Sequence, residues 1–243
     1  MGRAHEVRAA SMAKTAAAKS KLYAKWAKEI YMAAKSGVPD PDMNASLKRV
    51  IERAKKEQVT ADVIKRSIEK AKGGTGENYT SVSYQGFGPA GTSFIVECLT
   101  DNVSRTVAIV RNSYQKRGGN FGQTVMHQFE HKAILSTNEF NEEQVLEALI
   151  LNEVDADIEE EDGIVTVLGE YADYNKIKQA LFSLKEDINL VDDEVTYIPL
   201  NVMEITNPED IGKIERFIAD LDEIEDVQEY YHNAKWVSNE EEE

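Results

Sequence analysis

The side chains in this sequence that could do chemistry most directly are lysines and arginines on the outer sides of predicted helices. At about 100° per residue, Lys21, Lys25 and Lys28 fall on one side of a helix expected over residues 16–36. Cations gathered on one surface neutralise backbone phosphates and release their counterions, so this pattern predicts nucleic-acid binding. The residues assigned to the predicted surface are Lys14, Lys19, Lys21, Lys25, Lys28, Arg49, Arg53, Lys55, Lys56, Lys65, Arg66, Lys70, Arg105, Arg111, Lys116 and Arg117.

Other motifs have simpler structural explanations. The stretch 86–91 has the G-x-G-x-x-G spelling of a dinucleotide-binding loop, but it leads into a strand rather than a helix, which predicts a turn. His127 and His131 have metal-ligand spacing only on a helix, and this stretch is predicted to be a strand. Cys98 lies within an apolar strand, which is typical of an inert buried thiol. We therefore expect no catalytic residue, no cofactor and no metal site.

Charge is divided unevenly along the 243 residues, whose net charge is −16. Residues 1–72 carry 17 Lys or Arg against 8 Asp or Glu, whereas residues 133–243 carry 6 against 32. Such asymmetry predicts a basic module that meets a polyanion. The acidic remainder would restrain affinity or face basic protein partners. The alternative is that these charges form ordinary solvated faces.

Composition sets the class and the expected location. The content of 42% hydrophobic residues is typical of soluble globular protein, and a single cysteine excludes an intramolecular disulfide. No run approaches the roughly 18 apolar residues that a membrane helix needs. The first twenty residues lack the apolar stretch of a secretory signal. We therefore expect a cytoplasmic protein without membrane contact.

The first part of the chain reads as a helical domain. Apolar residues recur with helical spacing over 16–36, 44–57 and 60–72, and Gly73 to Gly76 predict a flexible joint. Residues before 16 show no apolar period, which predicts a basic arm.

Strands and helices alternate after the joint. Residues 133–200 are predicted to form a complete β-α-β-β-α-β unit, which is the pattern of ferredoxin-like domains. Two β-α-β halves flank it, with strands expected over 92–99, 124–129, 201–205 and 227–232. Because a two-stranded sheet is too small to be stable alone, we expect the halves to join into one sheet. Three domains in series are the alternative.

The predicted fold is therefore a multidomain α+β chain, in which a three-helix domain precedes two ferredoxin-like domains, one inserted in the other. The predicted domains are residues 1–75, residues 76–132 with 201–238, and residues 133–200.

Several short motifs also occur here in a characteristic order. They are residues 20–25 (SKLYAK), 40–44 (DPDMN), 51–55 (IERAK), 84–89 (YQGFGP), 97–102 (ECLTDN), 105–106 (RT) and 118–120 (GGN). With these motifs the chain resembles the YebC family over nearly its whole length, and within it the second bacterial subgroup. The resemblance implies a helical domain followed by two ferredoxin-like domains. It also implies a role in gene expression, since the family includes bacterial proteins described as transcriptional regulators and a mitochondrial translational activator of cytochrome oxidase.

The sequence thus predicts a non-enzymatic, nucleic-acid-binding regulator of gene expression, with promoter DNA as the first target. A ribosome-associated translation factor that binds rRNA is the alternative, because acidic domains suit basic ribosomal proteins better than duplex DNA. A second alternative is an acidic protein adaptor that binds no nucleic acid.

Overall fold

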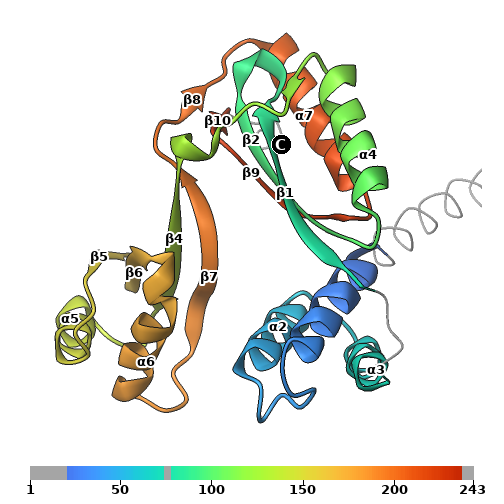
Figure 1. Ribbon diagram of the computed structural model, residues 1–243. Coiled ribbons are helices and arrows are strands. Elements are labelled where there is room, and N and C mark those ends of the chain that lie inside the picture. Colours follow the sequence, from blue (N-terminus) through green and yellow to red (C-terminus); the bar gives the residue numbers. More distant parts are fainter. Residues whose placement is uncertain (1–20, 74–77, 237–243) are drawn as a thin grey trace, which may run out of the picture. The chain divides into compact units, whose positions relative to one another are not determined.

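The computed structural model describes residues 21–73 and 78–236 (Figure 1). Helices come first and sheets follow, so the predicted α+β class is confirmed. The predicted basic arm, with Lys14 and Lys19, and residues 74–76 of the predicted joint lie outside the described residues.

The helical segment contains a helix that is described over residues 21–35, followed by α2 (Ala45–Lys56) and α3 (Ala61–Lys72). Asn44 caps α2, since its side-chain oxygen accepts a hydrogen bond from the Leu47 amide at 3.0 Å. The apolar sides of the three helices meet in one core. Its buried residues are Trp26, Ile30, Ala33, Ala34, Leu47, Ile51, Ala54, Val59 and Ile64.

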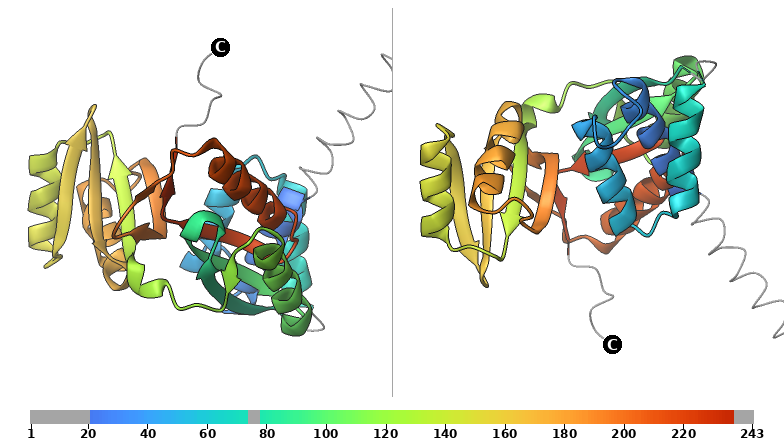
Figure 2. Two further views of the ribbon diagram at one scale, coloured as in Figure 1. Left: turned by 90° about the horizontal axis from the view of Figure 1, so that it is seen from above. Right: turned by 90° about the horizontal axis from the view of Figure 1, so that it is seen from below.

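The first sheet has the strand order β3-β1-β2-β9. These strands are β1 (Thr80–Phe87), β2 (Ser93–Thr100), β3 (Asn120–Phe121) and β9 (Val227–His232). Two helices, α4 (Val103–Lys116) and α7 (Pro208–Asp222), lie side by side against it (Figure 2). Phe217 of α7 contacts the rings of Phe94 and Tyr114 at centroid distances of 4.9 and 4.7 Å. The aromatic core of this sheet therefore joins segments more than 100 residues apart in the chain.

The second sheet has the strand order β5-β6-β4-β7. Its strands are β4 (Phe129–Thr137), β5 (Ala156–Glu161), β6 (Ile164–Glu170) and β7 (Leu190–Pro199). Its helices, α5 (Glu142–Leu151) and α6 (Tyr174–Leu184), pack on each other and contribute Val145, Leu149, Ile177 and Leu181 to the core. The order β4-α5-β5-β6-α6-β7 is the predicted β-α-β-β-α-β unit.

The two sheets share one arrangement with a permuted chain order. The strands β3, β1, β2 and β9 occupy the sheet positions that β5, β6, β4 and β7 occupy in the second sheet. In the chain, α4 follows β2 and α5 follows β4, which are the third strands of the two sheets. Likewise, α7 precedes β9 and α6 precedes β7, which are the fourth strands. Only β1 differs, because it comes before β2 in the chain, whereas β6 comes after β4. The chain leaves the first sheet after β3 and returns to it with β9.

Three expectations about strands were wrong. Residues 126–128 form a short 3₁₀ turn instead of the middle of a strand over 124–129, and only Val125 of that stretch is fully buried before Phe129. The strand expected over 201–205 shortens to β8 (Met203–Glu204), which pairs with β10 (Ala234–Lys235) outside the first sheet. The sequence reading missed β1, because its alternation is mostly polar and it contains a glycine.

The chain divides into two compact units. One comprises the residues up to Gln123 with Thr206–Tyr230, so it holds the helical segment together with α4 and α7. The other comprises Thr124–Ile205 with the residues from Tyr231 onward. None of the described helices has both the length and the apolar character that crossing a bilayer would require.

Gly86 of β1 provides a test of this first sheet. A β-carbon at this position would lie 2.6 Å from the Asn120 carbonyl oxygen and 2.9 Å from a ring carbon of Tyr114. We expect Gly86→Ala to lower the free energy of unfolding by about 1–3 kcal/mol, because the added methyl group overpacks backbone and ring atoms. Denaturant unfolding followed by circular dichroism would measure this.

Gly212→Ala in α7 is the matched control. Its β-carbon would meet only the mobile end of the Arg216 side chain, at 3.3 Å, and alanine favours a helix. This variant should be neutral or more stable by up to about 1 kcal/mol. Equal losses in the two variants would contradict the described pairing of β1 with β3.

Candidate nucleic-acid interface

The helix over residues 21–35 is buried on two sides. Trp26 and Ile30 face α2 and α3, and the Trp26 ring nitrogen donates a hydrogen bond to Glu57 at 2.9 Å. On another side, Tyr31 is 3% exposed and its ring meets the edge of Tyr79. A projection of this helix alone shows one apolar side, so the second contact surface was not visible in the sequence.

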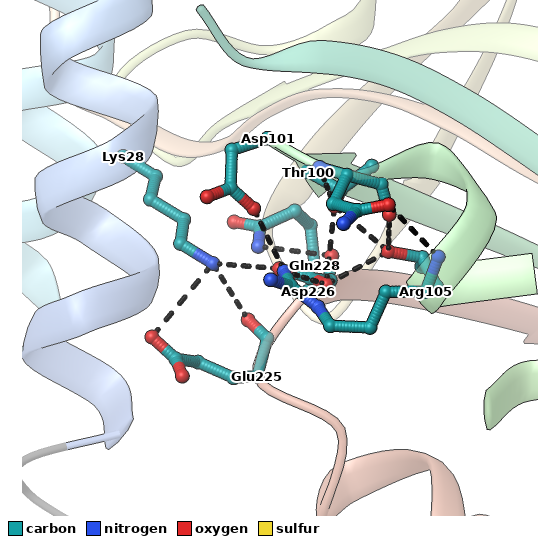
Figure 3. Close-up of polar contacts among 9 residues, drawn as sticks. Lys28, Thr100, Asp101, Arg105, Glu225, Asp226 and Gln228 are labelled. Atoms are coloured by element: carbon teal, nitrogen blue, oxygen red, sulfur yellow. Dashed lines mark hydrogen bonds and ion pairs between the residues drawn. The ribbon is translucent and has the colours of Figure 1, made fainter. Parts of the chain in front are cut away.

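Lys28 points into this second contact. Only 8% of the residue is exposed, and its Nζ donates to the Asp226 carboxylate at 3.1 Å and to the Glu225 carbonyl oxygen at 3.2 Å (Figure 3). The prediction that Lys28 lies on a solvent-facing lysine stripe is wrong. Its flexible stem carries the ammonium group to a buried carboxylate, which a helical projection cannot anticipate.

Asp226 is the centre of a polar network that joins three parts of the first unit. It lies just before β9, is 4% exposed, and accepts hydrogen bonds from Thr100 at 3.1 Å and Thr106 at 2.8 Å. The Arg105 guanidinium donates to it at 2.8 Å and to Asp101 at 2.8 Å (Figure 3). The network therefore ties the first helix, the β2–α4 junction and the start of β9 together.

The contacts around Asp226 lower its pKa. Burial by itself would raise the pKa, but the hydrogen bonds from Arg105, Thr106 and Lys28 outweigh it and lower the pKa to about 2. The carboxylate is therefore ionised and fully paired. Cys98 lies nearby, in β2. Burial raises the pKa of its thiol to about 12, so this thiol is inert as a nucleophile.

The sequence reading missed Asp226 as a site residue. Thr100, Asp101 and Arg105 were singled out within motifs, but nothing in the sequence relates them to a carboxylate more than 100 residues further along. Asn102, at the end of the motif 97–102, is the N-cap of α4, and its side-chain oxygen accepts a hydrogen bond from the Arg105 amide at 3.0 Å.

Several other predicted contact residues are bound to carboxylates of the segment 220–229. Arg117 donates to both oxygens of Asp220, at 2.6 and 3.0 Å, and Lys116 reaches the same group at 3.3 Å. These partners lower the pKa of Asp220, led by the hydrogen bond from Arg117. Arg53 pairs with Glu229 at 3.3 Å and lies over the Trp26 ring. Phosphates would have to compete with these carboxylates.

Most of the predicted cations that remain exposed lie on α2 and α3. Lys55 and Lys65 are exposed, and neither is given a carboxylate partner among the described residues. Together with Lys72, which pairs with Glu69 at 3.1 Å, they line a groove of about 430 Å³ along these helices. Ile64, Ile68 and Asp40 also line it. We refer to this groove and its lysine border as the α2–α3 surface.

The other predicted residues vary in exposure. Lys56, Lys70 and Arg111 are exposed, and Arg111 lies over the Phe121 ring. Arg66 is exposed and forms an ion pair with Asp62. Lys21, Lys25 and Arg49 are half-buried.

Residues 86–91 form the end of β1 and the turn into β2. Ala90 and Gly91 have φ values of 57° and 78°, so the predicted tight turn is confirmed. Across residues 21–73 and 78–236, no group of three or more His, Cys, Asp or Glu side chains is placed to hold a metal ion.

Family models match almost the whole chain. The TACO1/YebC N-terminal domain matches residues 3–74, and the TACO1/YebC second and third domain matches residues 79–234. The resemblance drawn from the short motifs is thus confirmed.

Relatives match over nearly their full lengths. A "Probable transcriptional regulatory protein" of Acholeplasma laidlawii is 53% identical over 239 residues, covering 96% of this chain and 98% of the relative. A protein of Pseudoalteromonas translucida with the same description is 49% identical, covering 96% and 98%. A conserved hypothetical protein of Aquifex aeolicus, solved by crystallography, has a TM-score of 0.72 at 29% identity and covers 93% of both chains.

The Asp226 network predicts a pH-dependent stability. The lowered pKa means that this carboxylate stabilises the fold above its ordinary pKa near 4, and that the contribution is lost as the pH falls through about 2. We expect Asp226→Asn to lower the free energy of unfolding at pH 7 by about 3 kcal/mol, because Lys28 and Arg105 lose their common partner. The deficit should shrink as the pH falls from 4 toward 2.

Denaturant unfolding at a series of pH values measures both effects. Glu223→Gln is the control, because the Glu223 side chain is exposed beside Arg105 and Asp226 and forms no ion pair among the described residues. An Asp226→Asn variant that behaves like this control at pH 7 would contradict the described network.

Proposed function

Because the chain belongs to the TACO1/YebC family, we propose that it is a non-enzymatic regulator of gene expression that binds nucleic acid through the α2–α3 surface. The observation that supports the proposal most is the border of exposed lysines, Lys55 and Lys65, that the carboxylates of segment 220–229 leave unpaired. Relatives named as transcriptional regulators support the same class of function.

Charge separation supports this assignment. Residues 21–72 carry 13 Lys or Arg against 7 Asp or Glu, a net charge of +6 in an otherwise strongly acidic chain. Phosphate contacts position a protein without reading sequence, and lysines on helix faces are suited to such contacts. The pairing of Lys28, Arg53, Arg105, Lys116 and Arg117 reduces the number of available cations. We therefore expect moderate, salt-sensitive affinity.

Promoter DNA is the first target that we propose, on the basis of the relatives' names. A second candidate is a ribosome-associated role with rRNA as the ligand. The observation that favours it is the net charge of −26 over residues 133–243, which duplex DNA would repel and basic ribosomal proteins would attract.

Charge reversal on the α2–α3 surface tests nucleic-acid binding. We expect Lys55→Glu combined with Lys65→Glu to weaken binding to both duplex DNA and structured RNA. Two phosphate contacts are lost, so the slope of log affinity against log salt should fall by about 2. Fluorescence anisotropy over a salt series measures the affinity and the slope together.

The control combines Arg216→Glu with Lys235→Glu, which changes the net charge equally at exposed residues outside the helical segment. It should bind with nearly the original slope. If both double variants lose affinity alike, the effect is one of net charge and the α2–α3 surface is not the contact.

Sedimentation of cell extract through a sucrose gradient separates the two targets. A promoter-binding regulator should remain near the top of the gradient after DNA is digested. A ribosome-associated factor should move with ribosomal particles and leave them at high salt, because its contacts are electrostatic. Co-sedimentation that the Lys55→Glu, Lys65→Glu variant loses would favour the second candidate over promoter DNA.

A further inference from the structure

The second sheet has one face packed against its two helices and one face without them. Ala133 and Leu135 of β4, and Val165 and Val167 of β6, are buried in the core with α5 and α6. Successive residues of a strand point to opposite faces. The residues between these four therefore lie on the other face, which we call the open face.

Strand register places the open-face residues in rows. Ile134 pairs with Leu168 across β4 and β6, and Leu168 pairs in turn with Asp157 of β5. In the next row Ser136 pairs with Thr166, which pairs with Glu159. The rows thus run from buried Ser136 and half-buried Ile134, Leu168 and Thr166 in the middle to exposed carboxylates on β5.

The open face is strongly acidic. Its exposed carboxylates are Glu130, Asp157, Glu159, Glu161, Glu170, Asp192 and Glu194. Among the described positions of this face, Lys132 is the one cation, and it is already paired with Glu170 at 2.7 Å. Half-buried apolar side chains lie between the acids: Ile134, Ile164, Leu168 and Ile198.

Edge protection accounts for only part of this arrangement. Charged residues on an edge strand such as β5 prevent it from pairing with other chains. Glu130, Glu170 and Glu194, however, lie on β4, β6 and β7, and β4 and β6 are inner strands. An excess of one charge on a surface lowers stability through repulsion. Acids on inner strands beside the apolar pair Ile134 and Leu168 therefore need another explanation.

We propose that the open face is a docking surface for a lysine- and arginine-rich protein segment that also carries apolar side chains. Charge complementarity selects the partner, since the exposed carboxylates attract cations and repel nucleic acid and anionic lipid alike. Ile134 and Leu168, which pair across the inner strands β4 and β6, supply the apolar centre that a protein interface needs, with the acids as its polar rim. This inference does not depend on whether the α2–α3 surface binds nucleic acid.

A peptide probe tests the docking surface in the full-length protein. The probe is a fluorescent peptide of about 12 residues that alternates lysine with valine, compared with a glutamate–valine peptide of the same length. We expect binding of the lysine peptide alone. Asp157→Lys combined with Glu159→Lys should weaken it about tenfold or more, because two rim charges become repulsive.

The matched control is Glu147→Lys combined with Glu186→Lys, which reverses two exposed acids outside the open face of the same unit. We call the Asp157→Lys, Glu159→Lys protein the β5 variant. Because its substitutions remove repulsion between carboxylates, its thermal unfolding midpoint should be equal to or above that of the original protein, and this result would show that the variant folds. The control should keep most of the peptide affinity.

Three outcomes would overturn the proposal. One is a lysine peptide that does not bind the original protein. Another is an equal loss of affinity in the β5 variant and the control, since net charge would then explain binding. The third is concentration-dependent self-association in sedimentation velocity that the β5 variant abolishes, because the occupant would then be a second copy of this chain. Loss of nucleic-acid binding in the α2–α3 variant, with peptide binding intact, separates this surface from the proposed function.

Discussion

The buried ion pair between Lys28 and Asp226 is the contact on which the first unit depends. Removing two charges from water is costly, and their attraction offsets that cost only when the remaining donors and acceptors are also satisfied. Thr100, Thr106 and Arg105 complete the set around Asp226. Since few orientations satisfy all these groups together, the network fixes how the first helix lies against the β2–α4 junction.

This constraint decides which cations are available to a ligand. The first helix has Lys28 on the side of Asp226 and Trp26 on the side of α2 and α3. On α2, Lys55 is exposed, whereas Arg53 pairs with Glu229 of the segment 220–229. Within the same segment, Asp220 pairs with Arg117. The sequence alone predicts both arginines to be phosphate contacts. The acidic C-terminal half therefore limits the basic surface within the fold, as well as by its net charge.

Local signals in the sequence predicted much of the fold. Helical apolar spacing located the helices of the helical segment, and the second sheet followed from the alternation of strands and helices. The reading failed where the evidence was not local. Strand β1 is largely polar and gains its place by pairing with β2 and β3, and residues 124–129 look extended although only Val125 is fully buried before the turn.

In the candidate site, too, features that depend on local sequence were predictable and features that depend on distant residues were not. The position of lysines along α2 and α3 follows from helical periodicity, so the exposure of Lys55 and Lys65 was predictable. The burial of Lys28 was not, because its partner lies nearly 200 residues away.

Nucleic-acid contact through the α2–α3 surface can be tested by ultraviolet crosslinking of the protein to its nucleic acid in living cells, with the attached peptides identified by mass spectrometry. We expect crosslinked residues within α2 and α3, between 45 and 72. Crosslinks confined to the two sheets, or to the segment 220–229, would contradict this expectation.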